Sequence, residues 1–123
     1  MVRVEETGFG YIVINGKRFD HDVVIRTDGS IEARKKELSS RYKRFIGHTP
    51  LGPEEAIDLL RDQPEIVIIG TGQYGVLPIH EEAEKILSKS GARIIKLKTP
   101  DAIREYNKLS LKHRTTALFH VTC

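Results

Sequence analysis

The sequence predicts an α/β fold of three layers: a mixed, mainly parallel sheet with helices on its faces and an N-terminal β-hairpin alongside. Two observations support this prediction. Residues 11–34 form short apolar runs separated by turn residues, whereas residues 51–121 alternate between helical and strand patterns. Such alternation is typical of parallel strands joined by right-handed helical crossovers. The length and the lack of a linker predict a single domain over residues 1–123.

The first third of the chain predicts strands and turns. The apolar residues 11–14 are followed by Asn15 and Gly16. This dipeptide favours a type I′ hairpin turn, because both residues tolerate a positive φ angle. Two further strands and a mostly irregular segment are expected over residues 19–25, 31–34 and 35–49.

Helices and strands alternate from residue 51 onward. Pro53 and the glutamates after it suit the first turn of a helix that ends before Pro64. The β-branched run at residues 66–69 predicts a strand covered on both faces. The same reasoning predicts helix, strand, helix and strand over residues 79–87, 94–97, 99–109 and 116–121.

A glycine-rich turn follows the buried strand in the stretch IVIIGTGQYG. Gly70, Gly72 and Gly75 have the G-x-G-x-x-G spacing of a dinucleotide-binding turn. In that turn the helix begins within the glycines, and an acidic residue ends the next strand. Here the helix begins near Pro78, and lysines end the next strand. We therefore expect no nicotinamide or flavin cofactor; the glycines then serve to let neighbouring backbone come close.

The same loop is a candidate site for a small anionic ligand. In open α/β sheets, ligands bind outside the carboxyl ends of the parallel strands. Glycines at such an end expose backbone N–H groups, which bind anions. The candidate ligand-binding residues from this reasoning are Gly70, Thr71, Gly72, Gln73, Tyr74, Thr99 and His120.

The C-terminal segment contains a histidine and a cysteine. Side chains alternate along a strand, so His120 and Thr122 face one side and Cys123 the other, which excludes a local Cys–His pair. His120 meets the glycine loop if the last strand is parallel to its neighbours; otherwise it is a hydrogen-bonded core residue. Asp20 and Asp22 are interpreted as turn and strand-edge residues, so no carboxylate pair indicates an acid–base site. No Cys/His spacing predicts a metal site.

Positive charge gathers in residues 34–44. The whole chain has 20 Lys and Arg against 17 Asp and Glu, a net charge of +3. In this stretch several basic residues, among them Arg34 and Lys36, stand against Glu37 alone. A basic patch attracts nucleic acid, but no RNA-binding or helix-turn-helix pattern accompanies this one. We expect a solvated surface here, with nucleic-acid binding as the weaker alternative.

The composition and the N-terminus predict a cytoplasmic protein. No apolar run is long enough to span a bilayer. The first residues carry glutamates and no apolar leader, and the single cysteine has no internal disulfide partner. We therefore expect no membrane association.

Several stretches resemble one family in their order and spacing. The most specific are GTGQYG, the Thr-Pro-x-Ala-x-x-x-Tyr-Asn run and the ending HVTC. The family is a small group of domains of unknown function that includes a mitochondrial complex I assembly factor and an adipogenesis-associated protein. The resemblance implies a three-layer fold around a mixed sheet and action through protein partners, with no established reaction. It adds family positions at Asn107, Arg114, Arg34 and Lys36, whereas the run around His48 is shorter than in the family.

Three functions remain open on the sequence. The first is a binding or assembly-type module with a polar pocket at the glycine loop, which takes a small anion or a protein partner. The second is a small enzyme that acts on an anionic metabolite through His120, and the third is nucleic-acid binding through residues 34–44. We favour the first, because a strand-end glycine loop is present and a nucleophile–base pair is not. The direction of the last strand decides whether His120 or Arg114 meets the loop.

Overall fold

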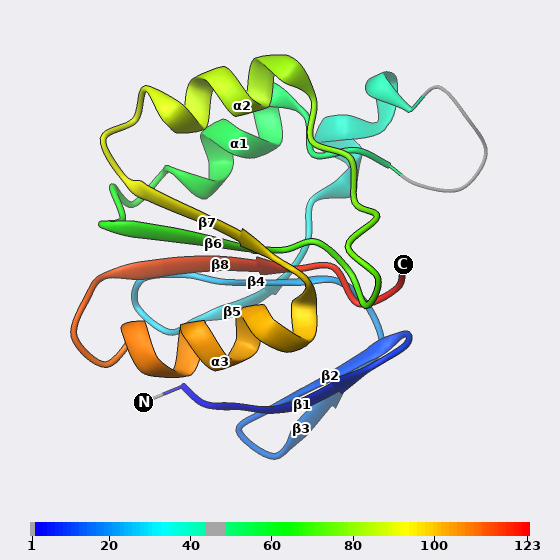
Figure 1. Cartoon of the computed structure of the whole chain (residues 1–123), viewed down its shortest axis with the longest axis vertical. Helices are drawn as coiled ribbons and strands as arrows, with labels where there is room; N and C mark the ends of the chain where they lie inside the picture. The colour runs from blue at the N-terminus through cyan, green and yellow to red at the C-terminus, as the bar shows by residue number, and fades with distance from the viewer. Residues whose placement is uncertain (1, 44–48) are drawn as a thin grey trace.

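The computed structural model describes residues 2–43 and 49–123 (Figure 1). A five-stranded mixed sheet lies between α1 and α2 on one face and α3 with a small three-stranded sheet on the other. The predicted α/β class, mixed sheet and N-terminal hairpin are confirmed. The strands are Val4–Gly8 (β1), Tyr11–Ile14 (β2), Lys17–Phe19 (β3), Val23–Ile25 (β4), Ile31–Ala33 (β5), Ile66–Gly70 (β6), Arg93–Leu97 (β7) and Thr115–Phe119 (β8). The helices are the 3-10 helix Lys36–Tyr42 (η1) and the α-helices Pro53–Leu59 (α1), Glu81–Ser88 (α2) and Thr99–Leu109 (α3).

The central sheet has the strand order β5-β4-β8-β6-β7. β6 pairs in parallel with β7 and with β8, while β4 is antiparallel to β8 and to β5. Every residue of β6 is buried, as its β-branched run predicts for a strand covered on both faces. Because β6, β7 and β8 are parallel, their carboxyl ends meet at one edge of the sheet.

The two faces of this sheet are packed by separate apolar clusters. Ile68 and Phe119 face α3 and the small sheet, whereas Ile69 and Leu118 face α1 and α2. Successive residues of a strand point to opposite faces, so β6 and β8 contribute to both clusters. No helix in the described part of the chain is long and apolar enough to cross a membrane.

The N-terminal strands differ in part from the prediction. The hairpin between β2 and β3 has φ angles of 50° at Asn15 and 78° at Gly16, as the turn type requires. The strand expected over residues 19–25 is instead two strands, β3 and β4, which belong to different sheets. A continuous run of strand-forming residues does not reveal the point at which the chain leaves one sheet for another.

β1 was not predicted, because its sequence VEETG is mostly polar. It pairs with β2 and is bound from the other side by Asn107 of α3. The Asn107 side chain accepts a hydrogen bond from the Val4 N–H at 2.9 Å and donates one to the Val4 carbonyl at 2.8 Å. These partners lie far apart in the sequence, so a local pattern could not indicate the strand.

The segment expected to be mostly irregular, residues 35–49, contains η1. This 3-10 helix packs against α1 and buries Ser39. Arg44 and His48 lie outside the described residues. The last strand ends at Phe119 rather than at residue 121, and the residues after it pack along the glycine loop.

Candidate functional site

The glycine loop, defined as residues 70–77, lies at the carboxyl edge of the central sheet. It follows β6, and its first residues are held by the neighbouring strands (Figure 1). The Thr71 N–H donates to the Leu97 carbonyl at 2.8 Å, and the His120 N–H donates to the Gly70 carbonyl at 2.9 Å. The loop therefore occupies the strand-end position that the sequence predicts.

The N–H groups of the glycine loop are hydrogen-bonded within the chain. The Gly72 N–H donates to the Thr99 hydroxyl at 2.9 Å, and the N–H groups of Tyr74 and Val76 both donate to the backbone oxygen of Cys123, at 2.9 and 3.1 Å. The other N–H groups of the loop likewise donate to carbonyl oxygens of the chain. The expectation that these groups are open to an anion is wrong, because the segment after β8, the start of α3, the end of β7 and the loop itself accept their hydrogen bonds.

The glycines of the loop allow close approach of other backbone. A Cβ atom placed on Gly72 would lie 2.1 Å from the carbonyl carbon of Cys123, and the φ angle of Gly72 is 109°. A Cβ atom on Gly70 would lie 2.9 Å from both the Phe119 ring and the Thr99 hydroxyl. These glycines let the C-terminal segment and α3 pack against the loop.

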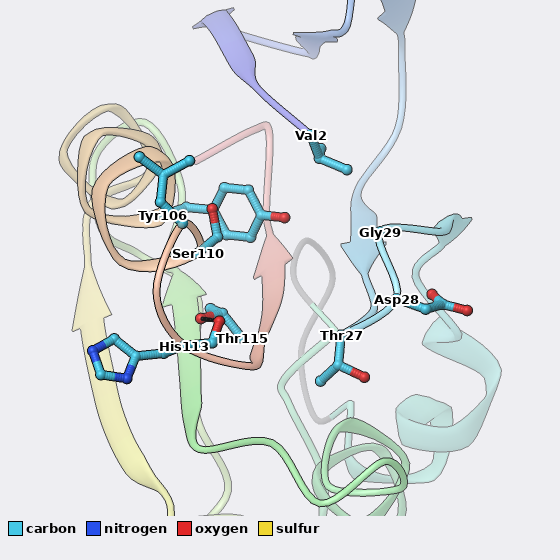
Figure 2. A pocket seen from close by; sticks show the side chains of 9 residues that line it. Val2, Thr27, Asp28, Gly29, Tyr106, Ser110, His113 and Thr115 are labelled. Atoms are coloured by element: carbon cyan, nitrogen blue, oxygen red, sulfur yellow. Dashed lines mark hydrogen bonds between the residues drawn. The ribbon is translucent and has the colours of Figure 1, made fainter.

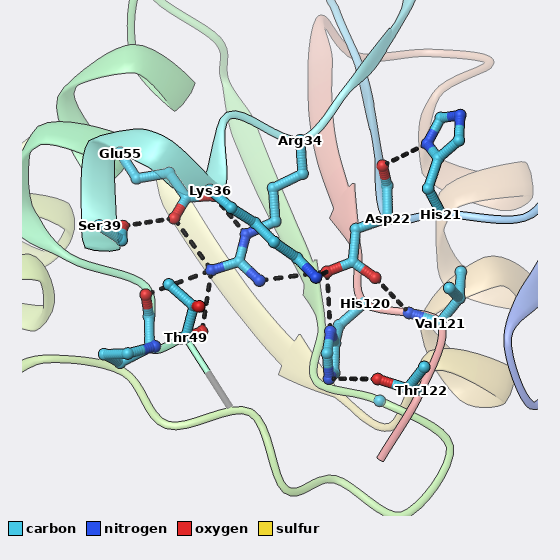
Figure 3. A network of polar contacts seen from close by, with 12 residues as sticks. His21, Asp22, Arg34, Lys36, Ser39, Thr49, Glu55, His120, Val121 and Thr122 are labelled. Atoms are coloured by element: carbon cyan, nitrogen blue, oxygen red, sulfur yellow. Dashed lines mark hydrogen bonds and ion pairs between the residues drawn. The ribbon is translucent and has the colours of Figure 1, made fainter. Parts of the chain in front are cut away.

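His120 lies behind the glycine loop in a buried polar network (Figure 3). Its side chain is 4% exposed. Nδ1 lies 2.8 Å from Oδ2 of Asp22, and Nε2 lies 3.2 Å from the Thr122 hydroxyl. The direction of β8, parallel to β6, brings His120 to the loop and leaves Arg114 at the other end of the strand.

Asp22 is the centre of this network; it lies at the edge of a strand, directly before β4, as expected, but its side chain is buried and charge-paired. It is 3% exposed and follows the point where the chain crosses from the small sheet to β4. One carboxylate oxygen accepts the Val121 N–H at 2.8 Å. The other lies 3.1 Å from Nη1 of Arg34 as well as beside His120, so a single carboxylate joins three segments of the chain.

Arg34 extends the network to α1 and η1. Its guanidinium binds Glu55 through two bonds, 2.6 Å from Nε to Oε2 and 3.0 Å from Nη2 to Oε1. The Ser39 hydroxyl donates to the same carboxylate at 2.6 Å. Glu55 is 1% exposed and Arg34 6%. Burying a charge is costly unless an opposite charge pairs with it, and here the arginine and the carboxylates pair with each other.

The basic stretch is therefore not a free basic patch in its described part. Arg34 is buried, Lys35 pairs with Asp58 at 3.1 Å, and Arg41 pairs with Glu54. Lys36 has a half-exposed side chain, and its amine lies 3.9 Å from Asp22. The sequence shows clustered charge but not the carboxylates that fold against it, so Arg34 is buried instead of lying on the expected solvated surface, and the weaker alternative of nucleic-acid binding loses most of its free cations.

The charges of the network hold Asp22 ionised. Burial acts to raise the pKa of Asp22, but hydrogen bonds from His120 and the Val121 N–H, with the electrostatic attraction of His120 and Arg34, outweigh it. The pKa of Asp22 is lowered to about 2. Burial likewise acts to lower the pKa of Arg34, and the paired carboxylates of Glu55 and Asp22 raise it above its usual range.

The low pKa of Asp22 predicts a pH-dependent stability. An unfolded aspartate titrates near 3.8, so ionised Asp22 stabilises the fold above about pH 4, and this contribution is lost as the pH falls through about 2. The shift corresponds to about 2 kcal/mol of unfolding free energy. Urea unfolding between these pH values measures the loss, and carbon NMR of the carboxyl group measures its midpoint. A midpoint of Asp22 near 4 would contradict the assignment.

Asn107 and Arg114 lie away from the glycine loop. Asn107 is two turns into α3, where it binds the backbone of Val4. Arg114 precedes β8 at the amino end of the sheet, and its guanidinium binds the Gln63 carbonyl. Of the candidate residues, the glycine loop, Thr99 and His120 lie together. Asn107 and Arg114 lie apart from them, because α3 and β8 run the full length of the sheet.

Two described pockets lie at the amino end of the parallel strands, opposite the glycine loop. One, of about 220 Å³, lies between the end of α3 and the β4–β5 turn and is lined by residues that include Tyr106, Ser110 and Thr115 (Figure 2). The other, of about 460 Å³, includes Arg114. The pocket expected at the glycine loop is neither of these. Among the described residues, no group of His, Cys, Asp and Glu could hold a metal ion.

Sequence reasoning missed the two carboxylates of the network. Glu55 is four residues before Leu59 and thus shares the buried face of α1, which is a detectable signal. Asp22 directly precedes the apolar run of β4, but nothing local distinguishes a buried carboxylate from a turn residue there. Its burial depends on Arg34 and His120, which arrive from other strands.

Large apolar side chains are exposed on the loops at the carboxyl edge. Phe9, in the β1–β2 turn, is 59% exposed, and Tyr74 and Val76, in the glycine loop, are 69% and 47% exposed. The ring centroids of Phe9 and Tyr74 are 6.4 Å apart. The turn and the loop also share the C-terminal segment, since the Gly10 N–H donates to the Val121 carbonyl at 2.8 Å. We call Phe9, Tyr74 and Val76 the aromatic surface.

Comparisons with known proteins agree with the fold. A family model for proteins of unknown function (DUF498/DUF598) matches residues 4–120. The conserved hypothetical protein PH1505 from Pyrococcus horikoshii OT3 is 37% identical over 98% of this chain and 99% of that chain, with a TM-score of 0.87. The protein MT938 is 32% identical over 100% of both chains, with a TM-score of 0.80. A Mth938-like domain from Bordetella pertussis shares the fold at 20% identity over 97% of this chain and 85% of that chain, with a TM-score of 0.64. The chain belongs to the DUF498/DUF598 family of proteins of unknown function.

Proposed function

We propose that the chain is a protein-binding module of the assembly type and that it binds its partner through the aromatic surface. The observation that carries this proposal is the contact between Phe9 and Tyr74, two aromatic side chains that are both more than half exposed. They come from loops that follow strands of different sheets, and exposed Val76 is two residues after Tyr74 in the same loop. Aromatic side chains are enriched at protein interfaces, where they supply much of the binding energy.

The loops that carry the aromatic surface are held in place from behind. The N–H groups of the glycine loop are hydrogen-bonded, and the Gln73 side chain donates to the Thr7 hydroxyl of β1 at 3.0 Å. The buried network of His120 and Asp22 fixes the segment that both loops contact. Side chains on a preordered backbone lose less entropy on binding, which favours affinity.

The position and the family support the same proposal. The carboxyl edge of parallel strands is where α/β folds place their binding sites. The resemblance to a family that includes a complex I assembly factor implies action through protein partners. The glycine loop then serves to present Tyr74 and Val76, while its backbone binds the chain's own C-terminal segment.

The test is selection from a random peptide library displayed on phage, followed by fluorescence anisotropy with the selected peptides. We expect the double variant Phe9→Ser/Tyr74→Ser to bind them at least about tenfold more weakly, a loss of about 1.4 kcal/mol. The matched control is Ile57→Ser/Leu111→Ser, because these side chains are 58% and 56% exposed but lie elsewhere. Equal losses in both variants, or no peptide that depends on Phe9 and Tyr74, would refute the proposal.

An acid–base site at His120 is the second candidate. The observation in its favour is the alignment of a carboxylate, an imidazole and a hydroxyl: 2.8 Å from Asp22 to Nδ1 and 3.2 Å from Nε2 to Thr122. Catalytic triads have the same arrangement: an acid orients a histidine base, and the histidine activates a hydroxyl nucleophile. It ranks second, because the adjacent loop has no N–H group left to stabilise an oxyanion. If the protein hydrolyses p-nitrophenyl acetate or p-nitrophenyl phosphate and Thr122→Val abolishes this activity, the acid–base site becomes the first candidate.

A further inference from the structure

We propose that the partner of the aromatic surface is an apolar peptide segment that carries an acidic side chain, and that Lys98 binds this carboxylate. The inference rests on the proposed function and names the chemistry of the partner. It starts from the position of Lys98, which follows β7 directly and precedes the first residue of α3.

Lys98 packs against the part of the glycine loop that carries the aromatic surface. A Cβ atom placed on Gly75 would lie 3.2 Å from Cγ and 3.6 Å from Cε of Lys98. Gly75 stands between Tyr74 and Val76 in the chain, so the aliphatic stem of the lysine lies against the loop backbone that carries both exposed residues. Lysine covers apolar surface in this way while its amine stays in water.

The amine of Lys98 has no acidic partner in the described part of the chain. Its neighbour two residues earlier, Lys96, pairs with Glu84 at 2.7 Å, and no ion pair within residues 2–43 and 49–123 includes Lys98. The side chain is exposed. An unpaired cation at the rim of an apolar surface favours a partner whose acidic group complements it.

The charge argues against two other occupants. A symmetric dimer through the aromatic surface would bring a second copy of Lys98 to the interface instead of a carboxylate that complements it. Nucleic acid requires several free cations along a backbone, whereas the described cations of the basic stretch are largely paired. A single unpaired lysine beside aromatic and aliphatic side chains fits one carboxylate on an apolar segment.

The experiment uses the selected peptides and reverses the charge at position 98. We expect peptides that depend on Phe9 and Tyr74 to be rich in acidic residues. Lys98→Glu should weaken their binding at least about tenfold, and peptides with lysine in place of the acidic residue should regain affinity for that variant. Lys112→Glu is the control, since Lys112 is exposed at the opposite end of the sheet and its substitution changes the net charge equally.

The outcomes separate this inference from the proposed function. Peptides that need Phe9 and Tyr74 but are indifferent to Lys98→Glu would overturn the acidic partner and leave the binding module intact. Peptides that ignore Phe9 and Tyr74 would overturn both. A dimer in sedimentation equilibrium that Tyr74→Ser abolishes would identify a second copy as the occupant. Binding of fluorescein-labelled oligo-dT that Tyr74→Ser abolishes would identify nucleic acid; either result overturns the acidic peptide.

Discussion

Replacing Asp22 with asparagine is expected to destabilise the fold by at least about 2 kcal/mol, because Arg34 and His120 lose the ionised carboxylate that they share. Arg34 would keep Glu55 but lose its second carboxylate, and His120 would lose the acceptor 2.8 Å from Nδ1. The asparagine side chain can still accept the Val121 N–H. The loss is therefore one of charge rather than of shape, and urea unfolding at neutral pH measures it.

The control for Asp22→Asn is Asp20→Asn, two residues earlier. Asp20 pairs with Arg18 at 2.7 Å, but both side chains are more than 60% exposed. Exposed ion pairs contribute little to stability, so no measurable change is expected there. If the two variants unfold at the same urea concentration, the buried network does not stabilise the fold in the way described.

Replacing Gly72 with alanine is expected to destabilise the fold by more than about 3 kcal/mol. A positive φ angle strains a residue with a side chain by about 1–3 kcal/mol, and at Gly72 the angle is 109°. The added Cβ would also lie 2.1 Å from the backbone of Cys123, a contact that only movement of the loop or the C-terminal segment can relieve. Thermal unfolding measures the total effect.

Gly91→Ala separates the clash from the strain. Gly91 has a φ angle of 85°, and a Cβ atom there would meet nothing within 4 Å. Only the strain of the positive φ is expected in this variant, about 1 kcal/mol. The difference between the two melting temperatures therefore reports the close approach at the loop, and equal shifts would show that the C-terminal segment does not constrain it.

The parallel half of the fold follows from local patterns in the sequence. The β-branched run of β6 and the helical stripes on either side are each visible within a short window, and Asn15 and Gly16 favour the turn that they form. β1 and the division between β3 and β4 do not follow from local patterns in the sequence. They depend on pairing with β2, Asn107 and β8, whose positions are decided only when the whole chain packs.

The candidate site divides in the same way. The sequence by itself placed the glycine loop after a strand, Thr99 at the start of a helix and His120 near the end of the last strand. It follows that these residues meet at one edge of the sheet if the strands are parallel. Only the tertiary structure decided the partners: the loop N–H groups bind the C-terminal segment, and Arg34 binds Asp22 and Glu55 in the interior. The reason is physical. Secondary structure depends on neighbours within a few residues, whereas hydrogen-bond and charge pairing depend on segments that folding brings together from distant parts of the chain.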